Sequence, residues 1–132
     1  MTSQARDDLE LELALPPAVR AGVAVPITMR VRNRGADPRD LYLLGREPTL
    51  DVIITRANGD TVWQRLKGEV LPALLAVRTL APGERLEVEA RWDQRTQAGA
   101  AATPGAYVAR GLLLTDGAPL AAGPTAFRIE AP

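Results

Sequence analysis

Apolar and polar residues alternate along most of this chain, and the alternation stops repeatedly at turn-forming residues. The clearest case is residues 85–92, in which every second residue is apolar: Leu86, Val88, Ala90 and Trp92. Side chains with a period of two point to opposite faces of a β-strand, so such a strand has one apolar and one polar face. The pattern predicts an all-β protein built from half-buried strands.

The same pattern recurs along the chain between clusters of turn formers. Strands are predicted at residues 9–15, 25–34, 50–55, 61–66, 77–80, 85–92, 107–115 and 127–130. Asn58-Gly59 is typical of a two-residue hairpin turn, and Ala81–Glu84 is typical of a type II turn. In the strand predicted at residues 50–55, Asp51 and Thr55 are expected to face outward.

Seven to eight short antiparallel strands without a convincing long helix predict an immunoglobulin-like β-sandwich, with a closed barrel as the alternative. Tyr107, just after Pro104-Gly105, suits the tyrosine corner of such sandwiches. We expect residues 1–8 to be an N-terminal tail and residues 9–132 to form a single β-sandwich domain.

The 132 residues include neither cysteine nor histidine. Their absence excludes a thiol nucleophile, a Ser-His-Asp triad and a zinc site built from thiolate or imidazole. Asp7, Asp8, Glu10 and Glu12 precede a strand or lie on its polar face, and no glycine-containing Asp-x-Asp loop accompanies them, so calcium is not expected. We therefore expect no enzyme activity, no cofactor and no metal.

Charge and hydropathy limit the partners. The chain has 16 basic and 16 acidic residues, and this balance argues against nucleic acid or an anionic membrane as a partner. No stretch approaches the ~20 apolar residues of a membrane-spanning helix. The first residues lack the apolar core of a signal peptide. The expected location is the cytoplasm, or outside the cell if a signal peptide has been removed.

The large aromatic and the charged side chains have structural interpretations. Trp92 continues an inward-facing series and is expected in the core, and for Trp63 the core is favoured over an interface anchor. The arginines at 30–34 are expected to pair across the sheet with outward acids such as Glu87 and Glu89 rather than with an acidic partner.

Two segments remain as candidates for a protein-binding surface. The first is the long loop 93–105, because loops on a sandwich scaffold commonly carry recognition; its alternative is an inert insertion. Its candidate contacts are Gln94, Arg95, Thr96 and Gln97. The second is 66–76, which holds more leucine than a short strand can bury and whose alternative is to close an open end of the sandwich. Its candidate contacts are Leu71, Leu74 and Leu75.

Several motifs occur in a familiar order. They are ITMRVRNRGADP (27–38), NGDTVWQ (58–64), LAPGERLEVEARWDQ (80–94) and TPGAYVARGLL (103–113). Together, over roughly residues 9–115, they resemble the intracellular proteinase inhibitor family of the BsuPI type. The chain departs from the family pattern in its alanine-rich loop 98–102 and in its extension over 116–132.

The resemblance implies an immunoglobulin-like β-sandwich whose partner is a protein. It also implies the family's founding activity, inhibition of an intracellular subtilisin-like serine protease, but it brings no site residues with it. The leading hypothesis is therefore a protein-binding sandwich that inhibits such a protease. The alternative is a non-inhibitory protein-interaction or structural accessory module, for example in an envelope or assembly protein.

Overall fold

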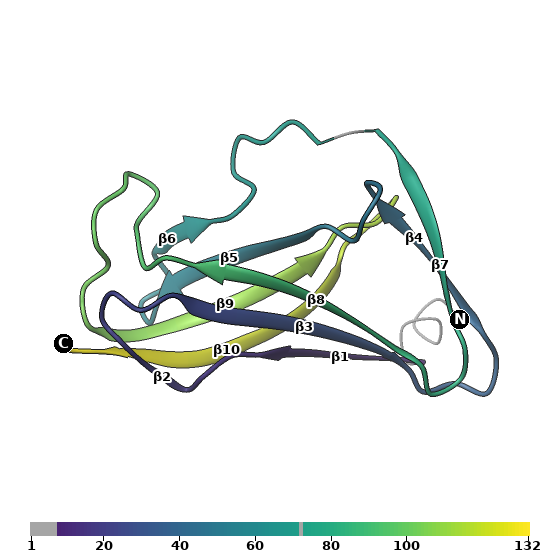
Figure 1. Ribbon diagram of the computed structural model, residues 1–132, viewed down its shortest axis with the longest axis horizontal. Coiled ribbons are helices and arrows are strands. Elements are labelled where there is room, and N and C mark those ends of the chain that lie inside the picture. Colours follow the sequence, from purple (N-terminus) through teal and green to yellow (C-terminus); the bar gives the residue numbers. More distant parts are fainter. Residues whose placement is uncertain (1–7, 72) are drawn as a thin grey trace.

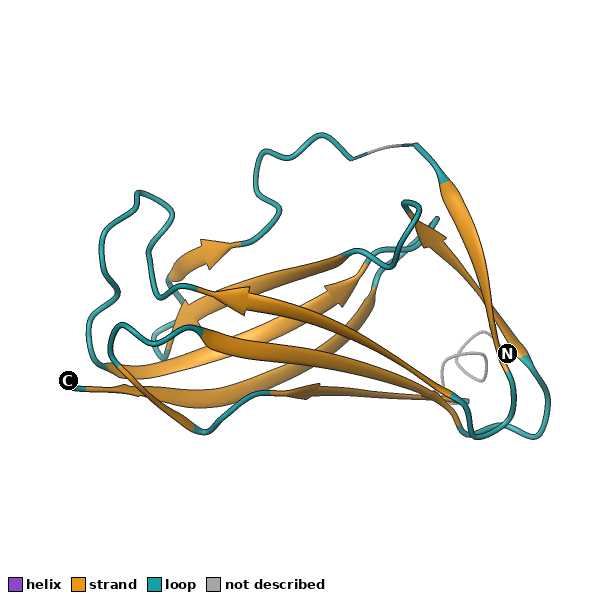
Figure 2. Cartoon of the chain, viewed as in Figure 1, coloured by secondary structure: helices purple, strands orange, loops and turns teal. Residues whose placement is uncertain are grey.

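The computed structural model describes residues 8–71 and 73–132, which form ten β-strands and no helix (Figures 1 and 2). The strands are β1 (Leu9–Ala14), β2 (Ala18–Arg20), β3 (Val25–Asn33), β4 (Arg39–Leu44), β5 (Leu50–Arg56), β6 (Thr61–Gln64), β7 (Leu75–Leu80), β8 (Arg85–Trp92), β9 (Gly105–Leu113) and β10 (Leu120–Glu130). The predicted all-β class is confirmed, with β2 and β4 added to the expected set. Of the predicted tail, residues 1–7 lie outside the described residues.

Two sheets pack face to face and form an immunoglobulin-like sandwich rather than a closed barrel. One sheet has the order β1-β3-β8 and the other the order β2-β10-β9-β5-β6. Neighbouring strands are antiparallel, except that β2 runs parallel to β10. The chain leaves the first sheet after β1 and enters the second at β2, across Pro16-Pro17. Proline has no N–H to give to a ladder, so it ends the pairing of β1 with β3 there.

Aromatic side chains fill one end of the core between the sheets. Trp92 is fully buried, and its ring stacks on Trp63 at 6.1 Å and meets the edges of Tyr107 and Phe127 at 6.0 and 6.2 Å. The hydroxyl of Tyr107 donates a hydrogen bond to the carbonyl of Thr103, so the tyrosine corner is confirmed. Trp63 packs against the core but stays half-buried.

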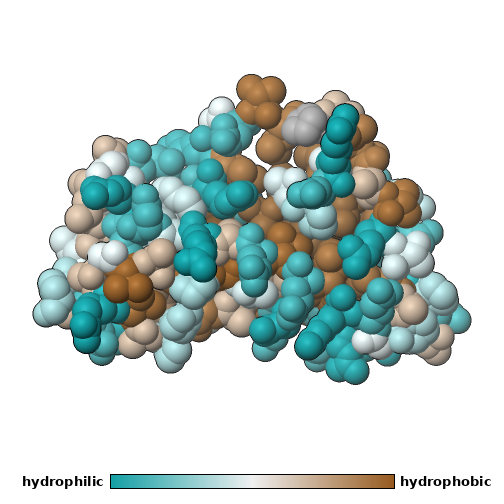
Figure 3. Space-filling model, in the orientation of Figure 1, coloured by the Kyte–Doolittle hydropathy of each residue, from teal (hydrophilic) through white to brown (hydrophobic). Residues whose placement is uncertain are grey.

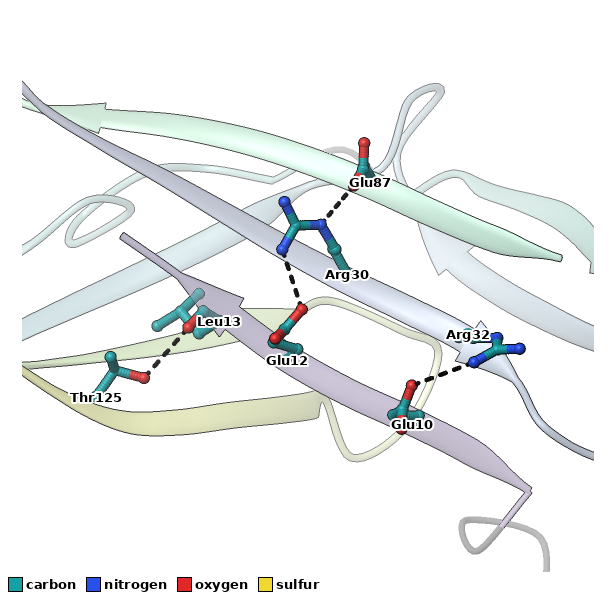
Figure 4. A network of polar contacts seen from close by, with 7 residues as sticks. All are labelled: Glu10, Glu12, Leu13, Arg30, Arg32, Glu87 and Thr125. Carbon is teal, nitrogen blue, oxygen red and sulfur yellow. Dashed lines mark hydrogen bonds and ion pairs between the residues drawn. The ribbon is translucent and has the colours of Figure 1, made fainter. Parts of the chain in front are cut away.

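The outer face of the three-stranded sheet carries an ion-pair network (Figure 4). Arg30 donates to Glu12 at 3.0 Å and to Glu87 at 2.5 Å, and it thereby ties β3 to both of its neighbours. The expected cross-strand pairing is therefore confirmed for Glu87. Glu89 instead lies opposite Thr28.

β5 differs from the expectation that its polar residues face outward. Asp51 and Thr55 are both buried. The carboxylate of Asp51 accepts hydrogen bonds from the Gln64 side chain at 2.7 Å and from the Leu66 backbone at 3.0 Å. The segment that follows β6 thus folds over this face, which a period-two pattern within β5 cannot reveal.

The third sheet is a two-stranded antiparallel ladder of β4 and β7, which we call the arm. Figure 1 shows the arm at one end of the molecule, away from the loop between β8 and β9. β4 follows β3, and β7 leads into β8 through the turn Ala81–Glu84. In that turn Glu84 donates its backbone N–H to Ala81 at 2.9 Å and Gly83 has a φ of 83°, so the predicted type II turn is confirmed.

Candidate protein-binding surface

The first candidate segment contains a residue that serves the fold. Gln94 is only 3% exposed and lies in the left-handed region with a φ of 63°. Its side-chain amide donates to the carbonyls of Arg20 at 2.9 Å and Val23 at 2.6 Å and accepts from the N–H of Gly22 at 3.1 Å. These bonds hold the turn before β3. The expectation of Gln94 as a partner contact is therefore replaced by a structural role.

The rest of this loop is an ordered hairpin. The backbone N–H of Thr96 donates to Ala100 at 2.7 Å, and the Arg95 side chain donates to Gly99 at 3.0 Å. Gln97 accepts from the backbone of Gln64 at 2.8 Å, which fastens the loop to β6. Its exposed tip, residues 98–100, carries only alanine and glycine. Interfaces depend on a few large anchoring side chains, and this tip offers none.

The second candidate segment lies next to the arm, and the two share an exposed apolar surface. In the described part of the chain, every exposed large apolar side chain except Val23 belongs to it. This apolar arm surface consists of Tyr42, Val70, Leu71, Leu74, Leu75 and Val77. In Figure 3 hydrophobic atoms gather over the segment before β7 and over the arm. The predicted residues Leu71, Leu74 and Leu75 are thus brought together, and they are exposed.

The register of the arm explains why apolar side chains stay exposed. Leu41 and Leu43 of β4 point into the core and are buried, so the alternate residues of β4 lie on the opposite face. Tyr42 lies opposite Val77 across the ladder, and these side chains are 47% and 58% exposed. A two-stranded sheet packs only one face against the core, and the arm leaves its other face to solvent.

Sequence reasoning missed Tyr42 and Val77 as parts of this surface. β4 has the sequence RDLYLL, in which both faces are apolar, so the strand shows no simple alternation. The four-residue leucine and tyrosine run 41–44 was the available signal. Three or more adjacent apolar residues in a short strand indicate either burial on both faces or an exposed patch.

The acidic residues near the N-terminus pair with arginines. Asp8 lies 3.6 Å from Arg39, and Glu10 lies 3.9 Å from Arg32. Asp7 lies outside the described residues. Among residues 8–71 and 73–132, no group of three or more acidic side chains is placed to hold a metal ion. Over the same residues, no helix is long and apolar enough to cross a membrane.

Comparison with solved structures shows similarity of fold. A β-glucosidase from Erythrobacter marinus matches 92% of this chain and 15% of its own, with 13% identity and a TM-score of 0.50. A Pseudomonas fluorescens alkylpurine DNA glycosylase bound to abasic-site DNA matches 94% of this chain and 31% of its own, with 16% identity and a TM-score of 0.49. The chain thus spans a third or less of these enzymes.

A CARDB domain from Pyrococcus furiosus, in complex with di-metal ions, matches 95% of this chain and 88% of its own, with 15% identity and a TM-score of 0.45. No curated protein matches the chain. The family described as intracellular proteinase inhibitor, BsuPI, matches residues 11–117, which is most of the chain and agrees with the region of the motif resemblance. The chain therefore belongs to the BsuPI family of intracellular proteinase inhibitors.

Proposed function

We propose that this protein inhibits a subtilisin-like serine protease by binding it, and that it has no catalytic activity of its own. Membership of a family described as proteinase inhibitors supports a protease as the partner. The same description, which calls the family intracellular, supports a cytoplasmic location. We also propose that residues 9–132 act as one domain.

The apolar arm surface is the observation that carries this proposal. Its six side chains are exposed on the arm and on the segment that leads into β7, and Val70 is 96% exposed. A group of large exposed apolar side chains on neighbouring segments is typical of a protein-interaction surface. The loop 93–102 is the weaker candidate, because its tip lacks large side chains and Gln94 is buried. We therefore assign the protease contact to Leu71, Leu74 and Leu75 rather than to Arg95, Thr96 and Gln97.

The test is a titration of an intracellular subtilisin-like serine protease, assayed with a chromogenic peptide substrate. Wild-type protein should inhibit with a stoichiometric end point. The double variant Leu71→Ser/Leu74→Ser should raise the inhibition constant by at least about tenfold, since anchoring side chains are lost from the interface. Val23→Ser is the matched control, because Val23 is also exposed but lies outside the apolar arm surface.

Three results would distinguish the inhibitor from a non-inhibitory module, and the second candidate segment from the first. Absence of inhibition at micromolar excess would remove the protease from the proposal. Binding of the protease without loss of its activity would favour the alternative, a non-inhibitory interaction module. Inhibition that is unchanged in the double variant but weakened in Arg95→Ala/Gln97→Ala would transfer the contact to the first candidate segment.

A further inference from the structure

β7 is an edge strand among the described residues, and no further strand pairs with its outer backbone groups there. In the described part of the chain β7 has β4 as its one neighbour. The N–H of Gly45 donates to Leu74 at 2.6 Å, which fixes the residues of β7 that bond to β4. In an antiparallel ladder the alternate residues turn both backbone groups to the other side. Leu75, Val77 and Thr79 therefore present their N–H and C=O groups at the outer edge.

The opposite edge of the arm confirms this assignment. Tyr42 and Leu44 lie opposite Val77 and Leu75 in the ladder. Leu44 donates its N–H to Leu114 at 3.1 Å, and Tyr42 accepts from the N–H of Asp116 at 3.0 Å. These two residues thus bond away from β7, as the alternation requires. The β4 edge is occupied by residues 114–116, whereas no strand of the described residues pairs with the outer edge of β7.

β7 also has fewer of the devices that protect other edges, since Arg78 is its one charged residue. Natural edge strands are short, bulged, charged or interrupted by proline. β2 and β6 are short, and β1 and β8 carry charged residues at alternate positions. β7 pairs regularly with β4 over six residues, contains no proline and exposes Leu75 and Val77 at 50% and 58%. A largely apolar edge of this length, with a single charged residue, is suited to strand addition.

We propose that β7 receives an extended segment of the target protease as an additional antiparallel or parallel strand of the arm. This inference rests on the proposed function and names the recognition mode of the same surface. The outward groups of Leu75, Val77 and Thr79 would bond the backbone of that segment. Its side chains would be apolar at the alternate positions that lie beside Leu75 and Val77.

The charge of Arg78 further restricts which protein segment can pair with β7. Arg78 is the one charged residue of β7, it is exposed, and within the described residues no ion pair engages it. It lies on the face opposite Val77, so the added segment should carry a carboxylate there. A second copy of this chain would bring another Arg78 to the same face and no carboxylate. The charge therefore favours a different protein over self-pairing.

The test uses the protease titration with variants of the edge. Val77→Pro deletes an outward N–H and fills the edge with the proline ring, while the bonds from β7 to β4 remain. The inhibition constant should rise at least about tenfold. Val77→Thr keeps the N–H and the branched shape and should change the constant by less than about threefold. Gln97→Ala, on the first candidate segment, should leave it unchanged.

Arg78→Glu provides a second variant that does not depend on the folding of Val77→Pro, because Arg78 is exposed. It should also raise the inhibition constant by about tenfold, through repulsion of the carboxylate. If wild type inhibits and both variants inhibit equally well, the strand-addition mode is wrong and the inhibitor function stands. If wild type does not inhibit, both proposals fall. A dimer in sedimentation that Val77→Pro dissociates would replace the protease segment with a second copy.

Discussion

At the scale of single residues, Asn33 joins the sandwich to the arm. It is the last residue of β3 and is fully buried. Its side-chain amide donates to the carbonyls of Asp37 at 2.8 Å and Leu80 at 2.9 Å, and it accepts from the N–H of Gly35 at 2.9 Å. One side chain thus holds both the turn into β4 and the end of β7. The position of the apolar arm surface depends on it.

Asn33→Ala should lower the free energy of unfolding by about 2 kcal/mol, because buried backbone groups lose their partners. Urea denaturation monitored by tryptophan fluorescence measures this change. Asn58→Ala is the control, since Asn58 makes its contacts in an exposed turn with Asp60 and should cost less than about 1 kcal/mol. Equal losses in the two variants would contradict the role given to Asn33.

The structural roles of Asn33 and Gln94 could not be predicted from the sequence. Asn33 is typical of a turn, and Gln94 begins a polar loop, so both patterns indicate exposed positions. Their bonds reach Leu80, 47 positions away, and Val23, 71 positions away. No local pattern encodes partners at such separations. The two amides are recognised only once the sheets bring these segments together.

At the scale of elements, strands with one polar face were predictable and strands without one were not. β3 and β8 follow the expected alternation along most of their length. β2 consists of only three residues, Ala18–Arg20, which is too short for a period to show. β4 is apolar on both faces, because one face meets the core and the other forms the apolar arm surface. The candidate surface was therefore half predicted: its leucines were found, and its β4 contribution was missed.

The charged face that links β1, β3 and β8 makes stability depend on pH. The hydrogen bond from Arg30 holds the pKa of Glu87 below its ordinary value of 4.5. As pH falls through 4.5 the unfolded chain takes up this proton before the folded chain does, so stability rises with pH in that window. The contribution is complete above the ordinary value and is lost as pH falls through the lowered pKa.

Glu87→Gln should therefore flatten the dependence of the melting temperature on pH below about 4.5 and should lower the melting temperature at pH 7 slightly. Thermal melts of both proteins from pH 3 to pH 7 measure the effect. Glu89→Gln, on the same face but opposite Thr28, should keep the wild-type slope. Because the pair is exposed, added salt should reduce the difference between wild type and Glu87→Gln. A difference that grows with salt would contradict the ion-pair explanation.

At the scale of the whole molecule, the last strand is part of the sandwich although it lies beyond the region that matches the family. The match ends at residue 117, and β10 begins at Leu120. β10 lies between β2 and β9 in the five-stranded sheet, and the hydroxyl of Thr125 donates to the carbonyl of Leu13 on β1 at 3.3 Å (Figure 4). The segment beyond the matched region therefore connects both sheets and is integral to the fold.

A chain that ends at Gly117 should consequently fail to fold. It would lose the buried Leu120, Phe127 and Ile129, and it would leave β9 without its neighbour. Deleting even one buried phenylalanine side chain costs about 3–5 kcal/mol, and whole domains are stable by only about 5–15 kcal/mol. We expect no cooperative thermal transition and no near-ultraviolet circular dichroism from Trp92, whose ring has lost Phe127. A chain ending at Glu130 should melt like wild type, since residues 131–132 are exposed. Cooperative melting of the shorter chain would show that β10 is an addition to a self-sufficient domain.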